Sequence, residues 1–514
     1  MAAFTLILVL LFSAGCEGPL DSEKPGKFTW VAESLDGHKN NFPEDAVPLE
    51  VNLESENDWM DLLAVISYKN VYVALDISKS TFAGLTAFDP GTFRTGKRYI
   101  VELILPDKST GIVGGSREWP AFRYFSYLSE ISGKNIETLG SYLFSGTVLE
   151  EIDFPALTFI DSYAFYNCRY LESVTIPESM DRINEGTFEN SRISEAVIPS
   201  GVKSIGASAF SGCGYLTSVT IPDSVKSIGK EAFARCSRLE SITIPAGVES
   251  IEEGVFKASG LTGINIPNSV KTIASFAFDN CSKLESITIP AGVESIEEGV
   301  FRTCGFTEIT IPESVTSIGS FAFYYCTKLE NVIIPDNVTS IGNFAFANCQ
   351  GLESIKIPES VISIGDSAFE YCTALTGITI PDSVTSIGKA AFRNCTWLAS
   401  VNIPDGVSAI EDFTFQGCAF SGIIIPGSVT VIGTGAFRGS RLESVIIPSG
   451  VTSIGEYAFF GCRNLAAVEF NAAIGEDNFF SDSFSGDLYE KYLAGGTGTY
   501  TTENPGNSAV WIKQ

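Results

Sequence analysis

The sequence predicts a solenoid, a stack of about 14 short coils that each add one short strand to a parallel sheet. Two observations predict this fold class. Phenylalanine recurs at steps of 22 or 23 residues from Phe165 to Phe459, and proline keeps the same period ten or eleven residues earlier, from Pro155 to Pro448. A fixed period of this length is the signature of repeat architectures, in which each unit buries its core only against its neighbours.

The strand of each coil is predicted from residue alternation ahead of the proline. In one unit, Val332 and Ile334 share a face while Ile333 lies on the other face. Proline cannot donate a ladder hydrogen bond, so each strand should end at its proline. The glycine after isoleucine, as at Gly229 and Gly342, is expected to adopt a positive φ. The periodic phenylalanines are expected to be buried.

The segments on either side of the repeats are predicted to be caps. Residues 144–470 carry the repeats, 49–143 form an N-terminal cap with degenerate repeats, and 471–514 form a C-terminal cap, because terminal units must seal an exposed core. Within the first cap, Ser55 precedes apolar residues at helical spacing, which predicts a short capped helix. Strands are expected over 71–77 and 99–105.

The beginning of the chain predicts export. Residues 1–15 form an apolar run of signal-peptide length that ends in small residues before Cys16. The sequence Ser-Ala-Gly-Cys at 13–16 looks like a bacterial lipobox, so Cys16 is the expected lipidation site, with a plain secretory signal as the alternative. Residues 16–48 are rich in proline and charge and are predicted to be a flexible tether.

Composition and motifs argue against catalysis. There are 33 Lys and Arg against 61 Asp and Glu, a formal net charge of −28, which disfavours nucleic acid as a partner. The single histidine, His38, leaves little acid-base or metal chemistry. The sequence therefore predicts no catalytic residues, no metal site, no cofactor and no small-molecule substrate.

Eleven cysteines lie in the repeats, each three residues after a periodic phenylalanine. Neighbouring coils would bring them within disulfide range, but an in-register column does not favour pairwise geometry. Ser191, Ser259 and Ser440 replace cysteine in three coils. A column of buried free thiols is the favoured interpretation, and disulfides are the alternative.

Two phrases carry a family resemblance. Ile-Gly-Asp-Ser-Ala-Phe-Glu-Tyr-Cys at 364–372 and Leu-Thr-Gly-Ile-Thr-Ile-Pro at 375–381 resemble the BspA-like leucine-rich repeats of host-associated bacteria. The segments 488–492, 496–500 and 511–514 resemble the closing segment of spirochaete-type members of this family, and 96–106 resembles their opening segment. The resemblance implies a leucine-rich-repeat solenoid on the outer surface of the cell envelope that attaches, like an adhesin, to host matrix proteins, host cells or other bacteria.

The outward row of each strand, two residues before the proline, is the expected protein-binding surface. Most of this row is Thr or Asn, and Ile424 beside Ile446 is the one apolar pair in adjacent coils. The candidate partner-binding residues are Lys356, Asn402, Ile424, Ile446, Thr243 and Thr288. The alternative function is a structural or antigenically variable envelope protein without a single ligand, because residues 237–256 and 282–301 differ only at Arg238 and Lys283.

Overall fold

The computed structural model describes residues 27–38, 42–82, 87–91, 95–506 and 509–514. Cys16 and the apolar run before it lie outside these residues. By internal contacts, the chain divides into two compact units. The first comprises 1–112, 122–136 and 147–156, and the second comprises 113–121, 137–146 and 157–514.

The described residues of the first unit form a five-stranded parallel sheet, a shorter parallel strand pair and two helices. Its sheet has the order β1 (Val47–Glu50), β2 (Val73–Asp76), β4 (Ile100–Ile104), β6 (Glu130–Ser132) and β8 (Glu151–Asp153), and β3 (Ala87–Phe88) pairs with β5 (Gly111–Ile112). The helices are α2 (Thr29–Leu35) and α3 (Glu56–Lys69), and η1 (Pro43–Asp45) and η2 (Lys97–Tyr99) are single 3₁₀ turns.

Helix α3 and strands β2 and β4 confirm the elements expected in this region. Ser55 caps α3: its side chain accepts a hydrogen bond from the Asp58 amide, and the Asp58 carboxylate accepts one from the Ser55 amide. Trp59, Leu62 and Ile66 are buried, so the helix turns its apolar stripe to the core.

Part of the predicted tether is ordered instead. Residues 29–35 form α2, with Val31 and Leu35 buried and Lys69 of α3 paired with Asp36. The prediction of a flexible segment over 16–48 is wrong for this stretch, because its few apolar residues fall on one side of a helix that packs against α3.

One lysine of the first unit is fully buried. The Nζ of Lys97 donates a hydrogen bond to the Gly91 carbonyl at 2.6 Å and lies 5.3 Å from the centre of the Phe125 ring. Burial lowers the pKa of Lys97 to about 8, against the raising effect of Asp89.

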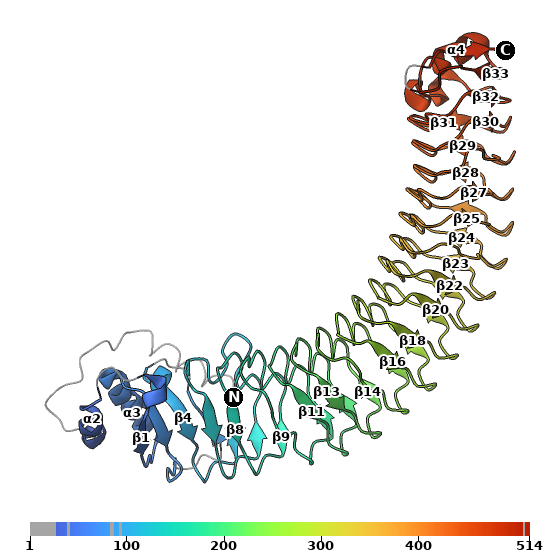
Figure 1. Cartoon of the computed structure of the whole chain (residues 1–514). Helices are drawn as coiled ribbons and strands as arrows, with labels where there is room; N and C mark the ends of the chain where they lie inside the picture. The colour runs from blue at the N-terminus through green and yellow to red at the C-terminus, as the bar shows by residue number, and fades with distance from the viewer. Residues whose placement is uncertain (1–26, 39–41, 83–86, 92–94, 507–508) are drawn as a thin grey trace, which may run out of the picture. The chain divides into compact units, whose positions relative to one another are not determined.

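The second unit is a stack of coils, each of which carries up to two short strands in separate parallel sheets (Figure 1). The strands ahead of the prolines are β11 (Glu195–Val197), β13 (Ser218–Thr220), β16 (Gly263–Asn265), β18 (Ser286–Thr288), β20 (Glu308–Thr310), β22 (Asn331–Ile333), β25 (Gly377–Ile378), β27 (Ser400–Val401), β30 (Ser444–Ile447) and β32 (Ala467–Phe470). Except for β32, which no proline follows, these strands end one to three residues before a proline, as predicted. The outward side chains of the set form the first strand face.

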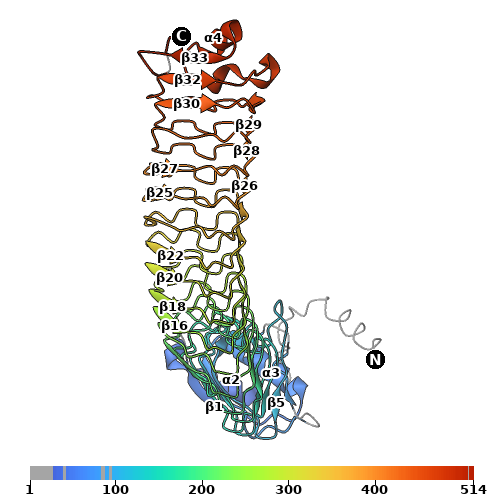
Figure 2. The same cartoon turned by 90° about the vertical axis from the view of Figure 1, so that its right-hand side faces the viewer.

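The second strand of a coil follows the proline turn. This set is β7 (Thr138–Leu139), β9 (Phe159–Ile160), β10 (Arg182–Ile183), β12 (Ser204–Ile205), β14 (Ser227–Ile228), β15 (Ser250–Ile251), β17 (Thr272–Ile273), β19 (Ser295–Ile296), β21 (Ser317–Ile318), β23 (Ser340–Ile341), β24 (Ser363–Ile364), β26 (Ser386–Ile387), β28 (Ala409–Ile410), β29 (Val431–Ile432) and β31 (Ser453–Ile454). Figure 2 shows the two sets along opposite edges of the stack. The outward side chains of this set form the second strand face.

The prediction of one strand per coil is therefore wrong. The second strand is only two residues long, too short for alternation to show in the sequence, but Ile341 still pairs in register with Ile318 and Ile364. The count of about 14 coils is also low, since the solenoid has about 18 turns. The additional turns escape a search for a 22-residue period because partners such as Val47 and Val73 are 26 residues apart.

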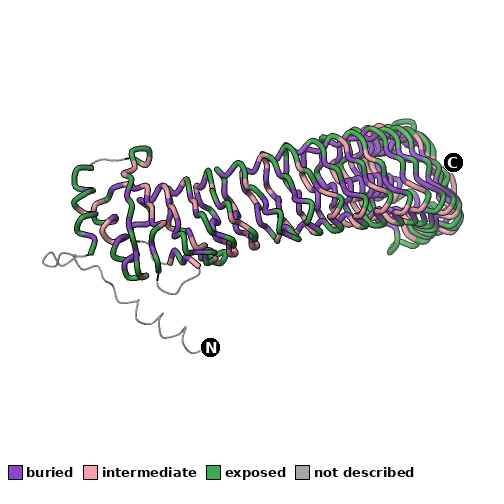
Figure 3. Tube along the Cα trace, turned by 90° about the horizontal axis from the view of Figure 1, so that it is seen from below, coloured by how far each residue is buried: buried purple, intermediate pink, exposed green. Residues whose placement is uncertain are grey.

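A ladder of phenylalanine rings fills the core of the second unit, as predicted. The periodic phenylalanines from Phe144 to Phe459 are buried, and successive rings stack at centroid distances of 5.0 to 6.1 Å with interplanar angles of 2 to 23°. Each such pair contributes about 0.5–1.5 kcal/mol beyond the burial of its area. In Figure 3 buried and exposed residues alternate along the coils.

The recurrent glycine after isoleucine has a different role from the one predicted. Neither Gly229 nor Gly342 has a positive φ, but a Cβ on Gly229 would lie 2.6 Å from the Ala207 amide nitrogen of the preceding coil. Glycine is needed there for close approach of backbones. The left-handed residues lie on both sides of the phenylalanine, as at Phe344 and Asn348, where the coil turns back.

Beyond β32 the parallel pattern ends. Strand β33 (Gly498–Thr501) pairs antiparallel with β32, and β34 (Ile512–Lys513) pairs antiparallel with β33. The 3₁₀ turns η3 (Glu476–Asn478) and η4 (Ser481–Ser483) and helix α4 (Leu488–Gly495) complete this end. Buried Phe484 stacks on Phe459 at 4.6 Å, so the closing segment continues the ring ladder by one step.

Gly299→Ala should destabilise the stack. Gly299 has a φ of +60°, and a Cβ there would lie 2.5 Å from two ring carbons of Phe276 in the preceding coil. The expected cost is about 1–3 kcal/mol, read as a lower thermal unfolding midpoint. Gly427→Ala is the control, because Gly427 has no positive φ and its Cβ would meet nothing within 4 Å. Equal midpoints for the two variants would contradict this account.

Candidate functional site

The first strand face presents its outward row to solvent along the second unit. Thr243, Thr288 and Lys356 are exposed. Asn265 pairs with both Thr243 and Thr288, which places these three side chains on consecutive coils at equivalent positions. The sheet therefore holds the row in a fixed spacing, so few rotatable groups need to be ordered when a partner binds.

The apolar members of this row are strongly exposed. The exposed fractions are 71% for Val197, 63% for Ile333, 85% for Ile424 and 53% for Ile446. Val197 and Ile333 are flanked by Thr or Lys on neighbouring coils, whereas Ile424 and Ile446 occupy successive coils. Gly422, beside Ile424, adds no side chain that could cover the pair. The predicted pair is thus an apolar patch on a polar face.

Asn402 is exposed, but its amide is used within the sheet. Its Oδ1 accepts a hydrogen bond from the Ile380 amide at 2.8 Å, and its Nδ2 donates to the Ile380 carbonyl at 2.7 Å. The side chain takes the place of a strand neighbour for Ile380, because β25 stops at Ile378. The Asn402 side chain therefore stabilises the sheet, and fewer of its hydrogen-bonding groups are left for a partner than the sequence suggested.

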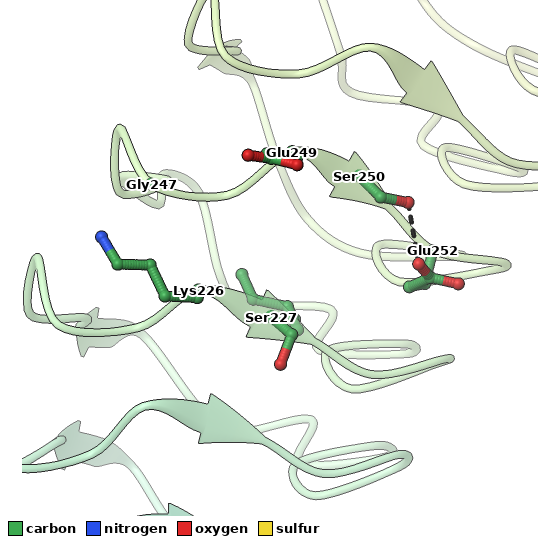
Figure 4. A pocket seen from close by; sticks show the side chains of 7 residues that line it. Lys226, Ser227, Gly247, Glu249, Ser250 and Glu252 are labelled. Carbon is green, nitrogen blue, oxygen red and sulfur yellow. Dashed lines mark hydrogen bonds between the residues drawn. The ribbon is translucent and has the colours of Figure 1, made fainter.

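The second strand face was missed in the sequence, which predicted only one strand per coil. The exposed residue just before each strand of this face alternates in charge at Lys226, Glu249, Lys271 and Glu294, and the row continues as Thr316 and Thr339. The face carries a shallow hollow of about 340 Å³, lined by Lys226 and Glu249 from adjacent coils and by Ser250, which donates a hydrogen bond to Glu252 at 2.8 Å. These side chains are drawn in Figure 4. The recurrent Ser-Ile pair after the proline turn is the sequence pattern that could have predicted this second strand face.

The cysteine column is buried and reduced. All eleven repeat cysteines are free thiols. Each Sγ donates to the carbonyl oxygen of the periodic phenylalanine in the preceding coil, at 3.0 to 3.3 Å, as for Cys349 and Phe323. The thiols therefore act as interior hydrogen-bond donors as well as small apolar groups.

Burial suppresses the reactivity of these thiols. It raises the pKa of Cys213, Cys326 and Cys395 to about 12 and the pKa of Cys281 and Cys462 to about 11. Where serine replaces cysteine, as at Ser191, its hydroxyl lies 3.4 Å from the next thiol, Cys213. A polar group small enough for the column is what these positions require.

Two further features concern the described residues as a whole. They contain no group of three or more His, Cys, Asp or Glu side chains arranged to hold a metal ion. None of their helices combines the length and apolar character needed to cross a bilayer.

The fold defines the class of protein, a parallel solenoid of short leucine- and isoleucine-rich coils. Five overlapping segments, 100–216, 203–329, 250–376, 294–419 and 362–485, match the family described as "BspA type Leucine rich repeat region (6 copies)". They span more than half of the chain, which belongs to this family. Proteins with this repeat fold generally act through protein interactions and are typically not enzymes.

Solved structures of bacterial leucine-rich-repeat proteins are similar. A leucine-rich repeat protein from Bacteroides ovatus is 32% identical with a TM-score of 0.54, and the match covers 60% of this chain and 79% of that one. A leucine rich cell surface protein from Faecalibacterium prausnitzii is 27% identical with a TM-score of 0.39, covering 73% and 88%. The pneumococcal vaccine antigen PcpA is 21% identical with a TM-score of 0.36, covering 70% and 80%. A search among curated proteins found no match.

The repeat thiols should be unreactive until the chain unfolds. A rise of the pKa from 9.0 to about 12 lowers the thiolate fraction about a thousandfold near neutral pH. In a Cys16→Ser chain, a chromogenic disulfide reagent should titrate almost no thiol under native conditions and all eleven in denaturant. Mass spectrometry that found cysteine bridges between neighbouring coils would contradict the free column.

Proposed function

We propose that the chain is an exported lipoprotein of the bacterial surface that binds protein partners through the first strand face. The observation that carries this proposal is the apolar patch of Ile424 and Ile446 on an otherwise polar, rigid and continuous surface. Such a combination of apolar centre and polar rim is typical of protein interfaces. Lys356 and Asn402 on preceding coils belong to that rim, and Thr243 and Thr288 form the more uniform part of the same face.

The family supports the cell-surface part of the proposal. The similar protein from Faecalibacterium prausnitzii is described as a cell surface protein. The partners proposed for this chain are host matrix proteins, host cell-surface proteins or other bacteria. No catalytic residue, cofactor or nucleic-acid partner is part of the proposal.

A second candidate function is a structural or antigenically variable envelope protein. Residues 237–256 and 282–301 differ at one position. Recombination between repeats requires nearly identical segments of this kind. In that case the solenoid itself would be the function, and its strand face would have no single ligand.

The binding surface is tested by two matched double variants. Ile424→Lys with Ile446→Lys should leave folding intact, because both side chains point outward, and should weaken binding to immobilised host matrix proteins at physiological salt about tenfold or more. The control is Thr243→Lys with Thr288→Lys, which adds the same charge to the same face.

The outcomes separate the alternatives. Loss in the isoleucine variant alone supports the patch, and loss in the threonine variant alone moves the site to the central coils. If neither variant changes the binding of a chain that binds well, the first strand face is not the docking surface. If the unaltered chain binds none of these proteins or cells, the structural role is favoured.

The anchor is tested separately at Cys16. Radiolabelled palmitate should be incorporated into the chain in its bacterial host and not into the Cys16→Ser variant, because the acylated cysteine follows the cleavage site of a lipobox. Equal labelling of both forms would refute lipidation, and protease treatment of intact cells would then show whether the solenoid is still displayed.

A further inference from the structure

Three arginines surround a hollow on the C-terminal coils of the second unit. Arg438 and Arg441 come from the coil of Phe437, and Arg463 comes from the next coil. With Asn464 and Phe460 they line a space of about 500 Å³, which is large enough for a sugar-sized ligand. The coils are held together here by the Gly439 amide, which donates to the Phe460 carbonyl at 2.9 Å.

The hollow results from a local change in coil length. Most coils have two residues between the cysteine position and the next leucine, as at Cys462-Arg463-Asn464-Leu465, but the preceding coil has only Arg441 between Ser440 and Leu442. The shorter loop leaves space in front of the longer one. Ser440 fits the column because its hydroxyl lies 3.3 Å from the Cys462 thiol.

None of the three guanidinium groups has an acidic partner among the described residues. The side chain of Arg438 lies over the Tyr457 ring at 5.6 Å, which uses the face of the guanidinium and leaves its N–H groups available. Three unpaired cations around one hollow are unexpected in a chain with a net charge of −28. Neighbouring cations without anions repel one another, and a bound anion would relieve that repulsion.

A similar hollow in the same unit is lined by arginines that have partners within the protein. Arg169, Arg192 and Tyr215 line a space of about 390 Å³ at another short loop, Ser191-Arg192-Ile193. There, Arg192 pairs with Glu172 at 3.1 Å and Arg169 donates to Asn167 at 2.8 Å. Arg192 and Arg238 also lie over the Tyr215 ring at 5.0 and 4.4 Å. In that hollow, Arg169 and Arg192 therefore have polar partners within the protein itself.

We propose that the hollow of Arg438, Arg441 and Arg463 binds a compact oxyanion, a sulfate or phosphate group, carried on a sugar. A carboxylate is saturated by one guanidinium fork, whereas a group with three or four oxygens accepts from several. A long polyanion is disfavoured because the rest of the chain repels it. The space beyond one oxyanion and the Asn464 amide suit the hydroxyls of the sugar that carries it. This site is independent of the first strand face.

Calorimetric titration of the purified chain at fixed ionic strength tests the site. The probes are inorganic sulfate, inorganic phosphate, glucose 6-sulfate, glucose 6-phosphate and glucose. One oxyanion should bind per chain, and glucose should not bind. Arg441→Gln and Arg463→Gln should each lower affinity about tenfold or more, because each removes a charge-assisted contact. Arg169→Gln with Arg192→Gln is the control and should bind like the unaltered chain.

Two controls distinguish loss of the site from unfolding of the variants and from the loss of positive charge alone. Thermal midpoints of the variants should match that of the unaltered chain, and Arg441→Lys should retain part of the affinity because the charge remains. Tighter binding of the sugar esters than of the inorganic ions supports the sugar-borne source. Equal or weaker binding of the esters overturns that part and leaves the free ion as ligand. Absence of saturable binding, or an equal loss in the control variant, overturns the site.

Discussion

Main-chain hydrogen bonding between successive coils, in register, is the interaction on which the rest of this structure depends. It operates in the strands, where Ile341 pairs with Ile318 and Ile364, and also in the turns, where the Phe323 amide donates to the Ala345 carbonyl at 2.8 Å. A coil of 22 or 23 residues is too small to satisfy its own peptide groups in the interior. Each coil is therefore stable only between neighbours.

Register turns every position of the repeat into a column, and each column has its own physical requirement. The phenylalanine column needs rings that stack at 5.0 to 6.1 Å. The cysteine column needs a small donor for the carbonyl of the preceding phenylalanine, which thiol and hydroxyl both provide. Glycine after isoleucine lets neighbouring backbones approach closely, since a Cβ on Gly229 would lie 2.6 Å from the Ala207 amide nitrogen, whereas other coils place Glu252 or Ala274 at this position. Asn402 shows that main-chain groups must be hydrogen-bonded even where a strand ends, since its side-chain amide bonds the Ile380 main chain in place of a strand partner.

The columns explain which features could be predicted from sequence. The phenylalanine and proline periods gave the solenoid, its buried rings and the outward position of Ile424 and Ile446, because a period of this length leaves few alternatives. The second strand escaped because two residues, such as Ser340 and Ile341, are too few to show alternation. The role of Gly229, the carbonyl bound by each thiol and the use of the Asn402 amide depend on contacts between residues more than twenty positions apart. Local patterns carry no direct signal for such contacts.

Register also limits where specificity can arise. In a uniform stack every coil presents the same side chains, so a partner could bind in many shifted positions with nearly equal free energy, and no coil would be preferred. A unique position requires a departure from the repeat. Two departures lie close together in sequence: the paired isoleucines at 424 and 446, and the short loop that carries Arg441. Both fall where two 22-residue steps follow each other, from Phe415 to Phe437 and from Phe437 to Phe459. The ring ladder continues through these coils at 5.7 and 5.0 Å, and buried Phe420 packs edge-on against Phe415 and Phe437. The stack therefore tolerates the exposed departures, and these coils are where a ligand could fix its register on the solenoid.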